Sequence, residues 1–212
     1  MINFTKYKVI LWDFDGVIMD SMPVRDKGFE IVLSSYPKQQ VDELLQFHQC
    51  NGGLSRYVKF RYFFERIRKE PVTDEDIARL SEAFSQIMRQ QLVNSKLLIE
   101  DSVSFIRQCG GRYKMHIVSG SDENELRYLC KSLNIDHHFI SIHGSPTPKT
   151  KLVSELVSDQ KYNCSDIIFI GDSKNDWNAA SAHGIDFAGY NNLELANLGI
   201  GYIHSSYANV QV

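Results

Sequence analysis

The sequence lacks the features that would place it in a membrane, on a secretory route or on nucleic acid. No apolar run approaches the ~20 residues that a membrane-spanning helix requires, and the opening residues, MINFTKYKVI, contain no signal-peptide core. Lys and Arg total 23 against 26 Asp and Glu, so no cationic surface for nucleic acid or an anionic membrane is expected. The composition therefore predicts a soluble, cytoplasmic protein that binds neither.

The sequence also lacks the cysteine and histidine spacings that are typical of metal or redox sites. The four cysteines form no CxxC pair, which argues against a zinc knuckle or a redox dithiol, and we expect them as unpaired thiols. The seven histidines include the adjacent pair His137–His138 but no HExxH or comparable spacing. Hydrophobic residues make up 43% of the 212 residues, so a packed core is expected.

Three short apolar runs each end at a polar residue. The runs are Val9–Trp12, Met115–Val118 and Ile167–Ile170, and they are followed by Asp13, by Ser119 and by Gly171-Asp172. Helical patterns separate them, at Ser102–Gln108, Glu123–Leu133, Thr150–Ser158 and Asn175–His183. Alternating strands and helices predict an α/β fold with a doubly wound parallel sheet. In such a sheet the polar residues at the strand ends converge on one crevice.

The segment between the first two runs has a different texture. Strand-like runs disappear and helical periods cover Val24–Ser34, Gln39–Gln49, Leu54–Lys69 and Thr73–Leu92. Thr73 and Asp76 have the spacing of a capping box at the start of the last of these. We interpret residues 23–93 as an all-helical cap domain that folds over the crevice, inserted into an α/β core of residues 1–22 and 94–212.

Asp13 and Asp15 suggest a metal site at the end of the first strand. In extended backbone both carboxylates point the same way, and they repel each other unless a cation lies between them or one is protonated. A hard divalent ion such as Mg²⁺ takes oxygen ligands and leaves positions for phosphate. A strand-end turn with solvated carboxylates is the alternative interpretation of this pair taken alone.

Four motifs together resemble the haloacid dehalogenase superfamily, specifically its phosphatases with a helical cap, similar to phosphoglycolate phosphatase and β-phosphoglucomutase. The run from Asp13 to Ser21 resembles the first family motif, and Val118-Ser119-Gly120-Ser121 resembles the second. Lys149 fits the third. Gly171-Asp172-Ser173-Lys174-Asn175-Asp176 matches the fourth, GDxxxD. The resemblance covers the chain from residue 8 to about 190.

The resemblance implies a role for each matched residue. Asp13 would be the nucleophile that forms an aspartyl-phosphate, and Asp15 the acid and base. Mg²⁺ would be bound by Asp13, by the backbone carbonyl of Asp15 and by Asp172, with Asp176 supporting the metal or capping a helix. The phosphate oxygens would be held by Ser119, by the amide of Gly120 and by amides around Gly16.

Two lysines could be the lysine of the third motif. Many capped relatives carry Lys immediately before Pro, whereas this chain has Ser145 before Pro146. Lys149 and Lys151 both follow. We prefer Lys149, because it would open a helix, as the residue that stabilises charge on the transferring phosphoryl group and pairs with Asp13. Lys151 is then an ordinary solvated lysine.

The helical segment carries one candidate for substrate recognition. Gly53-Leu54-Ser55-Arg56 resembles the cap loop of β-phosphoglucomutase-like proteins, in which Arg meets a second phosphate, so Arg56 is expected to bind substrate. Six basic residues lie between Asn51 and Glu70, and we interpret all except Arg56 as solvated: Lys59, Arg61, Arg66, Arg68 and Lys69. The apolar positions between them, Tyr57, Phe60, Phe64 and Ile67, predict a core stripe.

The resemblance implies an enzyme, a Mg²⁺-dependent phosphatase for a small phosphorylated metabolite such as a sugar phosphate or phosphoglycolate. A β-phosphoglucomutase-like mutase is the first alternative, although Gly171 replaces the Glu of the mutase motif. A non-catalytic binding or regulatory module on the same fold is the second. It is disfavoured because a nucleophile, an acid/base carboxylate and metal carboxylates are all present.

Overall fold

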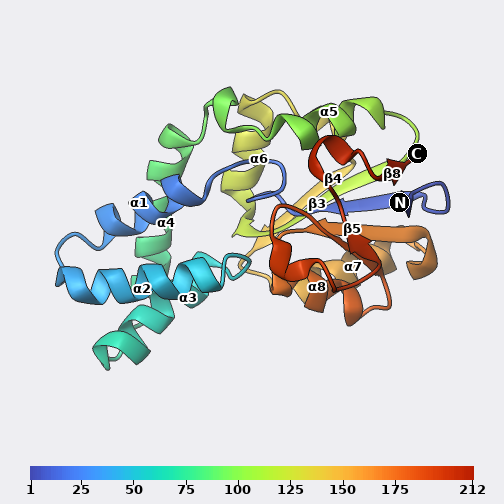
Figure 1. The fold of residues 1–212 in the computed structure, drawn as a ribbon. Coiled ribbons are helices and arrows are strands. Elements are labelled where there is room, and N and C mark those ends of the chain that lie inside the picture. Colours follow the sequence, from blue (N-terminus) through green and yellow to red (C-terminus); the bar gives the residue numbers. More distant parts are fainter.

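The computed structural model describes all 212 residues and centres on a six-stranded, fully parallel sheet (Figure 1). The strand order is β4-β3-β2-β5-β6-β7. In chain order the strands are β2 (Val9–Trp12), β3 (Lys114–Asp122), β4 (Ser141–Ser145), β5 (Ile167–Gly171), β6 (Asp186–Gly189) and β7 (Gly201–Tyr202). The predicted α/β fold class is confirmed, and the three strands expected from apolar runs are the adjacent central ones.

Helices cover both faces of the sheet, which explains why its central strands are apolar throughout. Successive residues of β2 alternate between two cores: Ile10 and Trp12 belong to the larger one, and Val9 and Leu11 to the smaller. On the first face lie α5 (Glu100–Gln108) and α6 (Glu123–Ser132), and on the second α7 (Lys149–Gln160) and α8 (Lys174–Ser181) (Figure 1).

The helical segment that follows β2, from α1 to α4, lies at one end of the sheet (Figure 1). It contains α1 (Met22–Val32), α2 (Lys38–Cys50), α3 (Arg56–Tyr62), a π-helix (Phe63–Arg68) and α4 (Asp74–Gln91). Phe29, Phe60 and Phe84 are buried against one another in its centre. The capping box of Thr73 and Asp76 is present at the start of α4. The domain boundaries at residues 23 and 93 stay a prediction.

Several elements were not expected from the sequence. β4 has the sequence Ser-Ile-His-Gly-Ser and β6 has Asp-Phe-Ala-Gly, so neither contains the apolar run that marks a buried strand. β1 (Ile2–Asn3) and β8 (Val210–Gln211) form a separate two-stranded parallel sheet that brings the termini together (Figure 1). Short 3₁₀ helices lie at Ser95–Leu97, Asp136–His138, Cys164–Asp166, Leu193–Leu195 and Ser205–Tyr207.

Two expectations from composition can be compared with the structure. All four cysteines are free, as expected, and Cys109 and Cys130 are buried. None of the helices combines the length and the apolar character needed to cross a membrane.

Candidate active site

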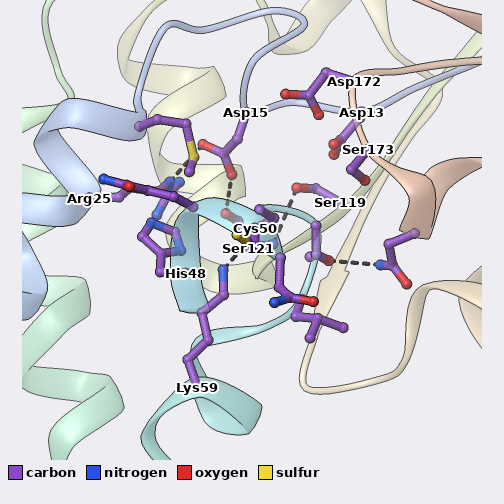
Figure 2. A pocket seen from close by; sticks show the side chains of 18 of the residues that line it. Asp13, Asp15, Arg25, His48, Cys50, Lys59, Ser119, Ser121, Asp172 and Ser173 are labelled. Atoms are coloured by element: carbon purple, nitrogen blue, oxygen red, sulfur yellow. Dashed lines mark hydrogen bonds and ion pairs between the residues drawn. The ribbon is translucent and has the colours of Figure 1, made fainter. Parts of the chain in front are cut away.

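The polar residues that end the central strands meet in one cavity, as the strand pattern predicts. Trp12 is level with Ile117 of β3 and with Ile170 of β5, so the residues that follow them emerge at the same edge of the sheet. This edge and the helical segment enclose a cavity of about 410 Å³. Six of the predicted site residues line it: Asp13, Asp15, Arg56, Ser119, Gly120 and Asp172 (Figure 2).

A buried lysine pairs with two carboxylates at the sheet edge. Nζ of Lys149 lies 3.0 Å from Oδ1 of Asp13 and also contacts Oδ1 of Asp176. These two carboxylates raise the pKa of Lys149 above its usual range, against the lowering effect of burial. Lys151 is exposed and pairs with Glu155. The geometry therefore brings Lys149, and not Lys151, to the predicted nucleophile.

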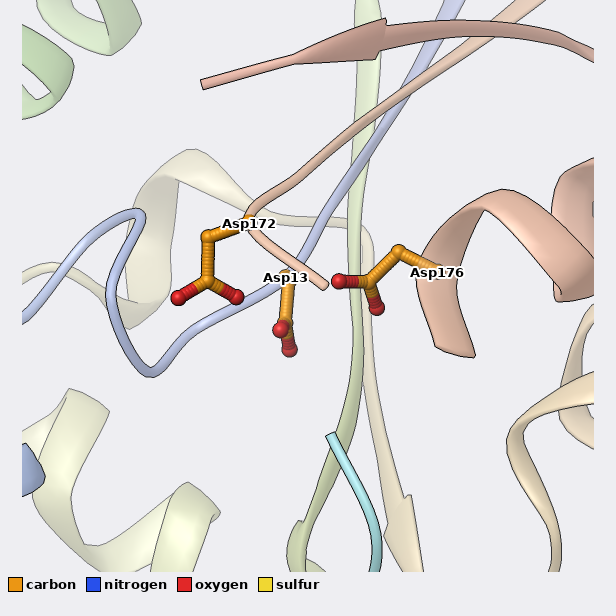
Figure 3. Close-up of side chains that lie close together, drawn as sticks. All are labelled: Asp13, Asp172 and Asp176. Atoms are coloured by element: carbon orange, nitrogen blue, oxygen red, sulfur yellow. The ribbon is translucent and has the colours of Figure 1, made fainter. Parts of the chain in front are cut away.

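The two carboxylates that pair with Lys149 form a cluster with a third, that of Asp172 (Figure 3). Ligand atoms of Asp13, Asp172 and Asp176 lie within 4.8 Å of one another. Burial raises the pKa of Asp13 to about 7, with Asp176 adding to the shift and Lys149 opposing it. Burial, then Asp13 and Asp176, raise the pKa of Asp172 well above its usual range. The cluster therefore holds more negative charge than Lys149 alone offsets.

This donor set fits Mg²⁺. Carboxylate oxygens are the ligands that a hard divalent cation prefers. A bound cation would relieve the mutual repulsion that adds to the effect of burial on both pKa values. The Asp15 side chain lies outside this group, so the expected contribution of Asp15 to a metal through its backbone carbonyl stays a prediction.

Asp176 has a second, structural task. It forms a capping box with Ser173 at the start of α8, in which Ser173 Oγ accepts from the Asp176 amide and the Asp176 carboxylate accepts from the Ser173 amide at 3.0 Å. Its other carboxylate oxygen contacts Lys149. Asp176 thus contacts the lysine and caps the helix. Of the two roles weighed from the sequence, the helix cap is present, and the support of a metal stays a prediction.

Asp15 points toward the helical segment. Its carboxylate accepts hydrogen bonds from Arg25 Nε at 2.7 Å and from Ser121 Oγ at 2.5 Å (Figure 2). It also accepts one from Ser21 Oγ. Burial raises the pKa of Asp15, but the charge of Arg25 and the hydroxyl donors outweigh it, so that the pKa is lowered. In this arrangement Asp15 is held as the carboxylate.

Two glycines allow close approaches that no side chain would permit. Gly16 has φ +74°, and a Cβ there would lie 1.9 Å from Oδ2 of Asp172. A Cβ on Gly120 would lie 2.3 Å from the carbonyl oxygen of Gly53, in the loop before α3. Gly16 therefore lets Asp172 approach the first motif, and Gly120 lets the cap loop approach the second.

Arg56 lines the cavity but already has an ionic partner. Its Nη1 lies 2.6 Å from Oε2 of Glu125, which belongs to α6, and donates to Ser85 Oγ at 2.6 Å. The guanidinium also stacks over the Phe84 ring, 4.7 Å from the centroid. Its expected contact with substrate stays a prediction, and Nη2 is the nitrogen left without a partner.

The sequence interpretation did not identify Arg25 or Glu125 as residues of the site. Arg25 bridges Asp15 and Glu125, at 2.7 and 3.1 Å, and Glu125 is fully buried. No motif links positions 25, 56 and 125, so only the fold reveals this network.

The expectation that Lys59 is solvated is wrong: Lys59 is 3% exposed and lines the cavity, because α3 packs that face against the site. The core stripe is confirmed, with Phe60 and Phe64 buried and Tyr57 and Ile67 packed on it.

Comparison with protein-family models decides the family. The model for the haloacid dehalogenase-like hydrolases matches residues 10–190. The chain belongs to this family. The predicted superfamily and the prediction of an enzyme are thereby confirmed.

Individual members of the family resemble the chain over nearly its whole length. It is 23% identical to phosphoglycolate phosphatase of Mannheimia succiniciproducens over 223 residues, covering 97% of both chains. It is 24% identical to phosphoglycolate phosphatase of Aliivibrio fischeri, covering 90% of this chain and 88% of that protein.

Solved structures share the fold. CbbY from Rhodobacter sphaeroides, in complex with xylulose 1,5-bisphosphate, superposes with a TM-score of 0.75 at 13% identity, covering 95% of this chain and 96% of CbbY. β-Phosphoglucomutase from Clostridium difficile gives a TM-score of 0.72 at 16% identity, covering 95% and 92%. At these identities the likeness establishes the fold alone.

Proposed function

We propose that the protein is a Mg²⁺-dependent phosphatase that hydrolyses a small phosphate monoester through an aspartyl-phosphate intermediate. One observation carries the proposal: Asp13, Asp172, Asp176 and Lys149 meet at the strand ends of a family hydrolase, beside a cavity of about 410 Å³. A buried carboxylate with a lysine at 3.0 Å and an excess of acidic neighbours suits attack on phosphorus once its charge is neutralised.

In the first half-reaction a carboxylate oxygen of Asp13 attacks phosphorus, and the bond from phosphorus to the leaving oxygen breaks. Lys149 stabilises the charge on the transferring group, and Ser119 Oγ with the Gly120 amide and the amides around Gly16 orient the phosphoryl oxygens. In the second half-reaction water attacks the same phosphorus and releases Asp13 and inorganic phosphate.

Asp15 handles the proton in both steps. It gives a proton to the leaving oxygen and later accepts one from the attacking water. Arg25, Ser21 and Ser121 stabilise the carboxylate form, which is the form needed to accept the proton. Donating one requires the acid form, so Asp15 must lose part of these hydrogen bonds when substrate binds.

The metal would be held by Asp13, Asp172 and the carbonyl of Asp15, with Asp176 supporting the metal from alongside and pairing with Lys149. When bound, Mg²⁺ offsets the negative charge of the phosphate and of its nucleophile. Glycine at position 16 keeps the Asp172 carboxylate close to the first motif.

Phosphoglycolate and sugar phosphates are the substrate types that we propose, because relatives aligned over nearly the whole chain are named phosphoglycolate phosphatase. We place the reaction in the cytoplasm. A β-phosphoglucomutase-like activity is the alternative for the same site. Mutases carry Glu before the fourth-motif Asp, whereas this chain has Gly171, at which a Cβ would lie 2.4 Å from Asp176.

The test is release of inorganic phosphate from a panel of metabolites that includes 2-phosphoglycolate and β-glucose 1-phosphate, with and without Mg²⁺. We expect Mg²⁺-dependent release that stops on chelation and returns with added metal. Conversion of β-glucose 1-phosphate to glucose 6-phosphate without net phosphate release would identify a mutase. No turnover of any ester, with intact folding and bound Mg²⁺, would indicate a binding module.

A further inference from the structure

The cavity has a second charged wall, formed mainly by the helical segment. Three cationic side chains line it, each at most 5% exposed: Arg25, Arg56 and Lys59. Figure 2 shows Arg25, His48 and Lys59 together on this side, across the cavity from Asp13 and Asp172. This cationic wall is distinct from the phosphate end, where Ser119 and Lys149 supply the donors.

Two of the three cations are balanced by carboxylates. Arg25 pairs with Asp15 and Glu125, and Arg56 pairs with Glu125, at distances of 2.6 to 3.1 Å. Two guanidinium groups therefore face two carboxylates, and this part of the wall is close to neutral.

Lys59 has no such partner. Its Nζ donates to the carbonyl oxygen of Gly52 at 3.1 Å and forms no ion pair with a carboxylate. Burial, reinforced by the charge of Arg25, lowers the pKa of Lys59 to about 7. The charges of Asp15 and Asp26 oppose this shift, but neither carboxylate forms an ion pair with Lys59. A buried ammonium group without a paired carboxylate is costly, so an anion bound beside Lys59 would be stabilised.

Polar atoms without a hydrogen-bond partner surround the same space. Nη2 of Arg25, Nη2 of Arg56 and both ring nitrogens of His48 are buried without a hydrogen-bond partner, and all three residues line the cavity. Burial lowers the pKa of His48 to about 2, so its neutral ring has one N–H donor and one acceptor nitrogen. Buried polar groups in native proteins are nearly always satisfied. An acceptor with two oxygens would satisfy the two guanidinium nitrogens and could also accept from the single N–H of His48.

We propose that the cationic wall of Arg25, Arg56 and Lys59, with the neutral His48 beside it, binds a carboxylate of the substrate, remote from the phosphoryl group, and that Lys59 is the specificity-determining residue. This inference rests on the proposed phosphatase function. One unpaired cation matches one carboxylate. A second phosphate would bring up to two charges and leave the wall negative, and a neutral sugar tail would leave Lys59 unpaired.

A matched pair of substrates distinguishes recognition of a substrate carboxylate by Lys59 from a general effect of Lys59 on catalysis. 2-Phosphoglycolate and ethyl phosphate have the same two carbons and differ in a carboxylate against a methyl group. We expect Lys59→Met to lower kcat/KM for 2-phosphoglycolate by about 10- to 100-fold, the range for losing a hydrogen bond to a charged group, and for ethyl phosphate by less than about threefold. Lys27→Met, at an exposed lysine of α1, should change neither.

Folding is checked by thermal unfolding without ligand. Lys59→Met should leave the Tm unchanged or raise it, because methionine removes a buried unpaired charge and keeps the volume. A large drop in Tm, or equal losses of kcat/KM on both substrates, would show that Lys59 supports the fold and would overturn the carboxylate subsite.

Calorimetry keeps the inference testable if wild-type protein turns over neither ester. Both compounds are titrated into Asp13→Asn protein with Mg²⁺, with and without Lys59→Met. Tighter binding of 2-phosphoglycolate than of ethyl phosphate, lost on Lys59→Met, supports the subsite even if the proposed hydrolysis fails. Equal binding of 2-phosphoglycolate to both proteins refutes it, whatever the outcome for the phosphatase.

Discussion

The two walls of the cavity carry opposite charge imbalances. At the strand ends three carboxylates lie close together, and one ammonium group, that of Lys149, pairs with two of them. On the cationic wall three basic groups surround two carboxylates, and Lys59 is the unmatched one. Both walls are buried, so neither imbalance is offset by water. The sign of the missing charge therefore indicates the ligand: a metal cation at one wall and an anion at the other.

The two walls also meet at a single residue. Asp15 leaves the first motif and ends at Arg25, which in turn holds Glu125. The proposed acid and base is thus tied to the wall that is proposed to recognise substrate. The following changes separate the two walls, from the largest expected effect to the smallest.

Asp13→Asn should abolish phosphate release, because the amide cannot act as the nucleophile. Quenched-flow measurements with labelled substrate should also find no phosphoenzyme, whereas wild-type protein should form one that hydroxylamine cleaves. The variant should stay folded by circular dichroism. Substantial activity with the same Mg²⁺ dependence would remove Asp13 from the mechanism.

Asp15→Asn should lower kcat by about 10²- to 10⁴-fold, the usual contribution of acid–base catalysis. The loss should be smallest for p-nitrophenyl phosphate, whose leaving group hardly needs a proton, provided that formation of the phosphoenzyme is rate-limiting. Pre-steady-state rates for nitrophenyl and alkyl phosphates make the comparison. Identical losses for both leaving groups would contradict the assignment of Asp15.

Glu125→Gln should lower the free energy of unfolding by about 3–5 kcal/mol, because it leaves two buried guanidinium groups short of a carboxylate. Urea denaturation measures the change. Glu155→Gln, which breaks an exposed pair with Lys151, is the matched control and should cost less than about 0.5 kcal/mol. Equal effects of the two substitutions would mean that the buried network contributes no more than a surface pair.

Lys59→Met should change how stability depends on pH. Because the pKa of Lys59 is about 7 in the folded protein against 10.5 normally, the unfolded chain binds more protons between these values. Wild-type stability from this group therefore rises with pH across that window. At pH 7 the methionine variant should be more stable by at least about 1 kcal/mol, given that one pKa unit is about 1.4 kcal/mol.

Chemical denaturation between pH 7 and 10 should show this advantage of the methionine variant shrinking as the pH rises. Lys27→Met should give no pH-dependent difference from wild type. If the free energies of unfolding of Lys59→Met and wild type differ by the same amount across the range, the charged form of Lys59 is solvated. The cationic wall would then hold no unpaired buried charge.

Much of the strand-end wall was predictable because its residues follow buried strands directly. A parallel strand shows in the sequence as an apolar run, and its end marks where a side chain enters the crevice, so Asp13, Ser119 and Asp172 could be placed together. The choice between Lys149 and Lys151 depended on helix geometry. With α7 beginning at Lys149, that residue lies beside Asp13, and the residue two positions on points to solvent.

The cationic wall could not be predicted in the same way. Arg25, Arg56 and Glu125 come from three helices, and the sequence separation of up to a hundred residues carries no signal of their pairing. Lys59 looked like a solvated residue of an amphipathic helix, and its burial follows from how α3 packs onto the core. β4 and β6 were missed for a related reason. Neither contains an apolar run of its own, and its place in the sheet depends on the strands beside it.

By itself the sequence determined the family, the parallel sheet and the carboxylates proposed for catalysis, because these depend on short motifs and on local apolar periodicity. Only the tertiary structure decided which charges are matched and which are left over. Charge balance in a buried cavity is set by side chains that converge from distant segments, and the energy of each depends on the others and on the exclusion of water. For this chain that balance leaves Lys59 without a counter-ion.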